Sequence, residues 1–223
     1  MEDSIFSLAE AYRLMLSYLK RAAPTGPPSF FDGCIDLFPS LNHTHLEQTR
    51  FHIAFGSNLG NRVELLQAAV NALQLEDGIV LEKISSVYES PALVMDGAAS
   101  QPDYLNAVAF GQTLLPPEDL LDVFMAIEAR FGRNRASEGR WQARTLDLDL
   151  LNWGTESIET SKLTLPHPCI ASRRFVLDPL SEIDPNLKLP SPYNCTVEYL
   201  LAHCQDPART TLSRFVLTIP ISG

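Results

Sequence analysis

The sequence predicts an α+β fold of the ferredoxin-like class, in which the order βαββαβ gives an antiparallel sheet with its helices on one face. Two observations lead to this prediction. Apolar runs suited to strands recur along the chain, and two segments between them have apolar residues at every third or fourth position. These patterns occupy, in order, residues 51–55, 62–74, 79–89, 104–113, 116–131 and 144–151. The face of the sheet without helices is then expected to be open and free to hold a site.

The first half of this order begins with a strand at residues 51–55, an apolar run that ends in a glycine-containing turn. A helix is predicted over residues 62–74, because its apolar side chains fall on one side of a 3.6-residue period. That side consists of Leu65, Leu66, Ala69, Val70 and Leu73. Residues 79–89 are rich in β-branched side chains, and the pair Ser90 and Pro91 ends this predicted strand.

The second half contains a strand at residues 104–113 and a helix that begins near Pro116. Acidic residues in the first turn of that helix favour its start, because they interact with the positive end of the helix dipole. A strand is then predicted over residues 144–151, because its side chains alternate between polar and apolar from residue 145 to residue 150. In a strand, Asp147 and Asp149 therefore share one face, and the leucines between and beside them point to the core.

The remaining residues are predicted to form two appendages to this unit. Residues 1–50 are expected to be an N-terminal extension, with an amphipathic helix over residues 4–21 and a Pro/Gly-rich linker after it. The domain itself is expected to span residues 51–190, and residues 191–223 to form a C-terminal tail. Two further short helices are expected, around residues 172–177 and 196–202.

Composition restricts the class of protein. The 223 residues are 45% hydrophobic and 20% charged, which is typical of a soluble globular chain. A net charge of -10 argues against nucleic-acid binding by bulk attraction. The four cysteines form no CxxC pair, and the sequence has neither a basic signal segment nor an apolar run of the roughly 18 residues a membrane span needs. We therefore expect a cytoplasmic protein with reduced thiols and no membrane partner; the oligomeric state is unknown from the sequence.

Two carboxylates and a group of arginines indicate where chemistry takes place. A divalent ion between Asp147 and Asp149 would relieve their mutual repulsion, and Mg²⁺ accepts one or two carboxylates together with phosphate oxygens. Arginines offer planar forks that suit phosphate, and five of them lie beside this predicted strand. They are Arg130, Arg133, Arg135, Arg140 and Arg144. The alternatives are a solvent-facing acidic strand and a solvated basic surface.

Three weaker signals accompany these groups. The turn that begins at Gly56 opens a predicted helix, where backbone N–H groups can approach an anion. Tyr104 and Asn106 share a strand face, so an aromatic ring could stack on a flat heterocycle beside an amide with a donor and an acceptor edge. His167 lies in a Pro-flanked loop. Each signal alone is equally compatible with a structural role.

Four motifs occur in an order that resembles one family. They are FGSNLGN at residues 55–61, QPDYLNA at 101–107, RWQARTLDLD at 140–149 and LPHP at 165–168. Over about residues 51–190 the chain resembles the 6-hydroxymethyl-7,8-dihydropterin pyrophosphokinases of the folate pathway. The resemblance implies a catalytic domain that transfers the β,γ-pyrophosphoryl group of ATP to the hydroxymethyl oxygen of the dihydropterin, leaves AMP and uses two Mg²⁺ ions.

The resemblance also implies roles for individual residues. Asp147 and Asp149 would hold both Mg²⁺ ions, and Arg135 and Trp141 would belong to a loop that closes over the site. The implied catalytic residues are Arg133, Arg135, Arg144, Asp147 and Asp149. The implied ATP contacts are Glu128, Arg133, Trp141, Arg144, Leu150, Lys162, Thr164, His167 and Arg173. The implied dihydropterin contacts are Gly56, Ser90, Pro91, Leu93, Tyr104, Asn106, Trp141 and Phe175.

Three positions depart from the pattern of the family. Lys162 stands where an arginine is expected, Met125 replaces a polar residue, and Pro168 replaces an aromatic one. Because these changes spare the aspartate pair and the residues implied to bind the pterin, we expect activity to survive. A nucleotidyltransferase is one rival hypothesis, although 91 residues separate Gly56 from Asp147. A non-catalytic ferredoxin-like binding module is the other.

Overall fold

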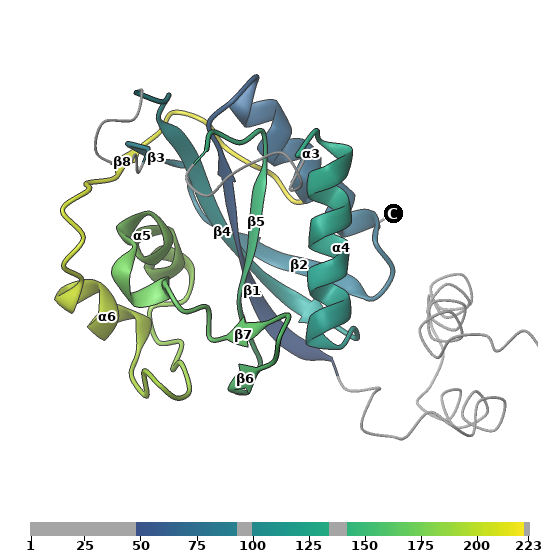
Figure 1. The fold of residues 1–223 in the computed structure, drawn as a ribbon, viewed down its shortest axis with the longest axis vertical. Helices are drawn as coiled ribbons and strands as arrows, with labels where there is room; N and C mark the ends of the chain where they lie inside the picture. The colour runs from purple at the N-terminus through teal and green to yellow at the C-terminus, as the bar shows by residue number, and fades with distance from the viewer. Residues whose placement is uncertain (1–47, 93–99, 134–141, 221–223) are drawn as a thin grey trace, which may run out of the picture.

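The computed structural model describes residues 48–92, 100–133 and 142–220. Its main feature is an antiparallel sheet with the strand order β5-β1-β4-β3-β8, in which β2 also pairs with β4 (Figure 1). This order of the four principal segments is the one expected for a ferredoxin-like βαββαβ unit. The strands are β1 (Thr49–Ser57), β2 (Ile79–Ile84), β3 (Tyr88–Ser90), β4 (Tyr104–Thr113), β5 (Asp147–Trp153) and β8 (Thr211–Leu212).

Two helices, α3 (Arg62–Leu75) and α4 (Pro117–Arg130), cover one face of the sheet (Figure 1). Alternate residues of β1, namely Phe51, Ile53 and Phe55, are buried beneath them. The apolar stripes of the two helices complete this core, as their spacing predicted. The predicted fold class and the shared side of its two crossover helices are therefore confirmed.

The opposite face of the sheet is not open, which corrects the sequence-based expectation. The helix α5 (Arg174–Ile183) lies over it, and α6 (Val197–His203) packs against α5 (Figure 1). Both helices contribute to a second core with the strands. The strands contribute Ala54, Val108, Phe110 and Leu151 to this core. A site on this face is consequently confined to the end of the sheet beyond α5.

The helix α5 is longer than the short helix predicted around residues 172–177. A 3-10 turn, η2 (Ile170–Ser172), precedes it, and the helix continues through Pro179 to Ile183. Pro179 lies in the middle of this ten-residue helix, where a proline normally argues against helix. Its burial in the second core, with Val176, Leu180 and Ile183, supplies packing that offsets the lost hydrogen bond.

The single strand predicted over residues 79–89 is divided into β2 and β3. The division occurs at Ser85, whose Oγ accepts the Val108 N–H at 3.0 Å, while its own N–H donates to Val108 O at 2.9 Å. The side chain thus replaces one ladder bond and lets the chain change direction. Gly111 permits the close approach of β2, because a Cβ there would lie 2.1 Å from Val80 O.

The strand β5 begins at Asp147 rather than at residue 144 and contains a β-bulge. His52 pairs with Asn152 and Ile53 pairs with Leu150, so Leu151 is the extra residue. The bulge turns Leu151 toward α5, whereas Leu148 and Leu150 face α3 and α4. The predicted alternation is undisturbed before the bulge, and both aspartates lie on the α5 side of the sheet.

The residues after 190, predicted as a tail, pack on the domain as far as residue 220. Leu217 is buried in the first core, and Gln67 of α3 exchanges two hydrogen bonds with the Thr218 backbone, at 2.7 and 2.9 Å.

A small second sheet pairs β6 (Ile158–Glu159) with β7 (Thr164–Leu165). Most of the predicted N-terminal extension lies outside the described residues. Among the described helices, none has the length and apolar character that crossing a membrane requires.

A buried histidine beneath α5 makes a pH-dependent contribution to stability. His52 is fully buried, and its Nε2 lies 3.1 Å from Asp184 Oδ2 at the end of α5. Burial lowers the pKa of His52 although Asp184 opposes this effect. The unfolded histidine therefore binds a proton at higher pH than the folded one, so acidification below about 6.5 favours unfolding.

We expect the urea midpoint to fall between pH 7.5 and pH 5.5, and to fall less in His52→Gln, which keeps a donor for Asp184. Both proteins are measured at both pH values, so that other titrating groups cancel in the comparison. An equal fall in the two proteins would contradict the assignment of this pH dependence to His52.

Candidate active site

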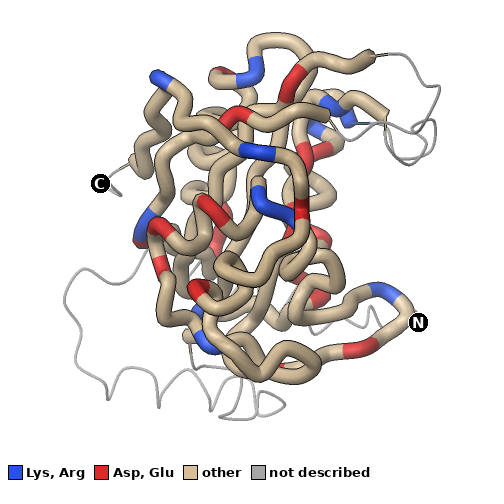
Figure 2. The backbone as a smooth tube through the Cα atoms, turned by 90° about the vertical axis from the view of Figure 1, so that its left-hand side faces the viewer, with Lys and Arg blue, Asp and Glu red and all other residues tan. Residues whose placement is uncertain are grey.

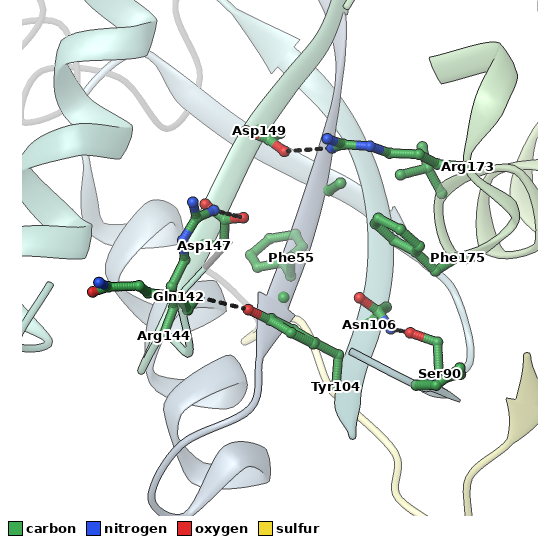
Figure 3. Close-up of a pocket in the computed structure, with 14 residues that line it drawn as sticks. Phe55, Ser90, Tyr104, Asn106, Gln142, Arg144, Asp147, Asp149, Arg173 and Phe175 are labelled. Carbon is green, nitrogen blue, oxygen red and sulfur yellow. Dashed lines mark hydrogen bonds and ion pairs between the residues drawn. The ribbon is translucent and has the colours of Figure 1, made fainter. Parts of the chain in front are cut away.

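The candidate site is a pocket at the end of the sheet, between the strands and the N-terminus of α5 (Figure 3). It collects residues from β1, β3, β4, β5 and the segment that leads into α5. Its lining residues are Ala54, Phe55, Gly56, Ser90, Pro91, Tyr104, Asn106, Gln142, Arg144, Asp147, Asp149, Arg173, Phe175 and Val176. Ten of the predicted site residues thus meet in one cavity.

The pairing of β1 with β5 gives the two aspartates their space. Asp147 lies opposite Gly56, and Asp149 lies opposite Ala54. Because these partners have no side chain or only a methyl group, the carboxylates border open volume instead of a packed surface. A Cβ added at Gly56 would lie 3.6 Å from the Asp147 Cβ and 3.7 Å from Asn106 Oδ1, and it would fill the floor of the pocket.

Three arginines from different parts of the chain surround the aspartate pair. Arg133, just after α4, places Nη1 2.5 Å from Asp147 Oδ1, and Arg144 places Nη1 2.7 Å from the other oxygen. Arg173, just before α5, approaches Asp149 to 3.9 Å (Figure 3). The site therefore combines concentrated positive charge with two carboxylates within an acidic chain.

Acidic and basic positions are interspersed along the backbone seen in Figure 2. Such a mixed arrangement differs from the extended basic stripe that tracks a nucleic-acid backbone. With a net charge of -10, the electrostatics favour a small anion at the arginines of the pocket.

Glu128 does not line the pocket but contacts Arg133, which binds Asp147. It is fully buried on α4, forms an ion pair with Arg133 and accepts the Leu148 N–H at 2.8 Å. The backbone supports this arrangement, because Gly132 takes a φ of +89° and Arg133 N–H then returns to Glu128 O. Glu128 consequently orients Arg133 toward Asp147 from behind the strand.

The two carboxylates differ in their environment. Limited hydration in the pocket raises the pKa of the Asp149 carboxyl, and the neighbouring charge of Asp147 raises it further, against the opposing effects of His167 and Arg173. Asp147 holds two close guanidinium partners, whereas Asp149 has a single distant one. A positive ion beside Asp149 would stabilise its ionised carboxylate, which limited hydration and the charge of Asp147 disfavour.

The donor set fits Mg²⁺. Asp147 and Asp149 line the same cavity from one strand face, and no group of three or more His, Cys, Asp or Glu suited to a metal occurs within the described ranges. Zinc sites usually require three or four protein ligands, whereas Mg²⁺ uses one or two carboxylates plus phosphate and water. A divalent ion would also stabilise the ionised carboxylate of Asp149, which is disfavoured in the pocket.

The other end of the pocket is aromatic and neutral. Tyr104 and Phe175 point into it from β4 and α5, and Asn106 lies between them (Figure 3). The Asn106 amide is only 4% exposed and donates Nδ2–H to Ser90 Oγ at 2.9 Å. This bond fixes the amide with Oδ1 near the pocket floor, where it can accept from a ligand.

Several residues implied by the resemblance lie elsewhere. Lys162 forms an ion pair with Asp122 at 2.6 Å and does not line the pocket, and Thr164 is exposed on β7. The Leu150 side chain is in the core on the opposite face. His167 does not line the pocket; burial lowers its pKa, and its Nδ1 accepts the Cys169 N–H at 3.2 Å.

Three implied residues, Leu93, Arg135 and Trp141, lie outside the described residues. The structure adds pocket residues that the sequence did not indicate. They are Ala54, Phe55, Gln142 and Val176. Ala54 could have been found from its position two residues before Gly56 on the same strand face, but its place opposite Asp149 depends on strand register.

A ferredoxin-like sheet that joins a carboxylate pair and three arginines to an aromatic slot defines a phosphoryl-transfer enzyme for a flat heterocyclic substrate. Comparison with known families agrees with this class. The family model described as 7,8-dihydro-6-hydroxymethylpterin-pyrophosphokinase (HPPK) matches residues 52–185. The chain belongs to this family.

Two bacterial proteins illustrate the similarity to curated relatives. The chain is 46% identical to 2-amino-4-hydroxy-6-hydroxymethyldihydropteridine pyrophosphokinase of Haemophilus influenzae, over 63% of this chain and 84% of that protein. It is 42% identical to the protein of the same name from Pseudomonas aeruginosa, again over 63% and 84%.

Among solved structures, Plasmodium falciparum HPPK-DHPS with pterin and p-hydroxybenzoate matches with a TM-score of 0.53 at 14% identity. This match covers 70% of the present chain and 43% of the longer one. It therefore supports the fold and says nothing of any further activity of the longer chain.

Proposed function

We propose that this chain carries out the reaction of its family with ATP as the donor. The pyrophosphoryl group would pass to the hydroxymethyl oxygen of 6-hydroxymethyl-7,8-dihydropterin, and AMP would leave. Membership in the family makes the chain a pyrophosphokinase that acts on hydroxymethyldihydropterin in folate biosynthesis. The observation that carries the proposal is one pocket with an aromatic, amide-lined end and a charged end.

The dihydropterin is proposed to bind at the aromatic end. Tyr104 and Phe175 would stack on the two faces of its ring, and stacking of this kind contributes about 0.5–1.5 kcal/mol beyond area burial. Asn106 Oδ1 would accept from the polar edge of the pterin, since Nδ2 is held by Ser90 Oγ. The Ser90 hydroxyl, which accepts from Asn106, keeps its own proton available for the ligand.

The triphosphate of ATP is proposed to bind at the charged end. Arg133, Arg144 and Arg173 would neutralise phosphate oxygens, and their guanidinium groups suit bidentate contacts. Asp147 and Asp149 would hold Mg²⁺, which we propose as two ions. When bound, the metal supplies charge neutralisation on the phosphates and polarises the phosphorus that is attacked.

Positioning is the main contribution of the protein. A primary alcohol is a weak nucleophile. Among the described residues of the pocket, the two carboxylates are the groups that could act as a general base. Stacking would hold the dihydropterin at the aromatic end, and the arginines would hold the phosphates at the charged end of the same pocket. Such orientation of two reactants can replace about 7–11 kcal/mol of entropic barrier.

The direct test combines purified protein with ATP, Mg²⁺ and 6-hydroxymethyl-7,8-dihydropterin and follows AMP. We expect AMP in proportion to the pterin diphosphate formed, and none when the pterin is omitted. Release of pyrophosphate would support a nucleotidyltransferase instead. Absence of pterin-dependent turnover in folded protein would overturn the proposal.

Asn106→Ala is expected to raise KM for the dihydropterin by about 10–100-fold, with KM for ATP within about twofold of wild type. The reason is that the variant removes the acceptor proposed for the pterin edge and leaves the charged end unchanged. Gln112→Ala, on the same strand but beyond the pocket, is the matched control. A parallel rise in both KM values would argue against a pterin-specific role.

We also propose that the enzyme works in the cytoplasm on small-molecule substrates, without nucleic acid or a membrane as partner. The net charge of -10 and the interspersed acidic and basic positions along the backbone (Figure 2) argue against nucleic acid as a partner. Isothermal titration of the protein with Mg²⁺ and a non-hydrolysable ATP analogue would count the ions. A single ion at saturation would contradict the proposed pair.

A further inference from the structure

The turn between β1 and α3 contains a buried amide that contacts both sides of the pocket without lining it. Asn58 is 1% exposed. Its Oδ1 accepts the Arg144 N–H at 2.6 Å, and its own backbone N–H donates to Arg144 O at 3.0 Å. These reciprocal bonds fix the backbone of Arg144, whose guanidinium binds Asp147 at the charged end.

The other end of the same amide binds the segment that enters β4. Asn58 Nδ2 donates to Pro102 O at 3.2 Å and to Gln101 Oε1 at 3.4 Å. Pro102 lies two residues before Tyr104, the aromatic residue on one side of the slot. One buried side chain therefore joins the segments that carry Arg144 and Tyr104, which are 40 residues apart in sequence.

We propose that Asn58 is a positioning residue that holds the phosphate-binding Arg144 and the pterin-stacking Tyr104 in register across the pocket. The inference rests on the proposed roles of those two residues. An amide suits this task, because it offers an acceptor and two donors in one plane, and all three are used here.

A purely structural role would be to keep the turn attached to the sheet. That function is already supported by the neighbouring Ser57, whose Oγ donates to Thr145 O at 2.6 Å. The backbone bonds of Asn58 and Leu59 to Arg144 O also remain when the Asn58 side chain is replaced. Loss of the amide is therefore expected to displace Arg144 and Tyr104 more than it unfolds the turn.

The test compares Asn58→Ala with Asn58→Asp by steady-state kinetics, with KM measured separately for ATP and for dihydropterin. The alanine variant loses all three side-chain bonds, so kcat should fall at least about tenfold and both KM values should rise. The aspartate variant keeps the acceptor for the Arg144 N–H but loses both donors. Its KM for dihydropterin should rise about tenfold, and its KM for ATP should stay within about twofold.

Asn61→Ala is the matched control, because Asn61 lies in the same turn, is exposed and makes no capping bond with its side chain. We expect its kinetics to remain within about twofold of wild type. Unchanged constants in Asn58→Ala, or an equal rise of both KM values in Asn58→Asp, would overturn the inference. Urea unfolding establishes that each variant is folded, and if one Asn58 variant does not fold, the kinetics of the other decide. Wild type without pterin-dependent AMP formation would instead refute the proposed function.

Discussion

Asp149→Asn is expected to lower kcat by about 10²–10³-fold or more while the fold stays at least as stable as wild type. The activity loss follows because the amide cannot replace a carboxylate as a Mg²⁺ ligand. Stability is retained because the pocket raises the pKa of Asp149 through limited hydration and the charge of Asp147, so its ionised form is unfavourable. AMP formation gives kcat, and urea unfolding gives the free energy of unfolding.

Asp147→Asn should lose as much activity but also lose stability, which separates the two aspartates. Its carboxylate oxygens hold Arg133 and Arg144. The variant leaves the Arg144 guanidinium without this charged partner, while Arg133 keeps its ion pair with Glu128. Glu156→Gln, an exposed carboxylate outside the pocket, serves as the control. Full turnover in Asp149→Asn, or stability losses in proportion to activity in both variants, would contradict a metal-binding role.

Arg144→Ala is expected to lower kcat by about 10²–10³-fold, with a smaller change in KM for dihydropterin. The variant removes a positive charge beside the proposed phosphate site, where developing negative charge needs neutralisation. Arg144→Lys should recover only part of the rate, because an ammonium group lacks the planar fork. Single-turnover AMP formation at saturating ATP separates this effect on the chemical step from weaker binding.

The comparison for this prediction is Arg130→Ala, which removes an exposed arginine from the last turn of α4. Its turnover should remain within about twofold of wild type. Equal losses in the two variants would indicate that general positive charge, rather than the position of Arg144 beside Asp147, sustains the rate.

Much of the sheet could be predicted because its signals are local. The alternation over residues 146–150 placed Asp147 and Asp149 on one face, and the helical periods placed α3 and α4 on the opposite one. Periodicity of this kind depends on neighbouring residues alone, so it survives folding unchanged. Ten of the residues implied by the motif order also line the pocket, since motifs with chemical groups at strand ends are brought together by the pairing of β1, β4 and β5.

Other features depend on contacts between distant segments. The break at Ser85 needs the Val108 N–H, and the bulge at Leu151 needs the register with His52. The ten-residue α5 persists through Pro179 because its apolar side packs on the apolar face of the sheet and buries both. None of these partners is close in sequence, so no local pattern could indicate them.

The sequence by itself determined the order of the elements, the shared face of the aspartates and the four ordered motifs on which the family resemblance rests. Only the tertiary structure decided that α5 covers most of the second face and confines the site to one end of the sheet. It also decided that Glu128 acts through Arg133, and that Asn58 joins the two ends of the pocket. The physical reason is that side-chain alternation is a property of one strand, whereas burial and hydrogen-bond partners arise from packing between strands and helices.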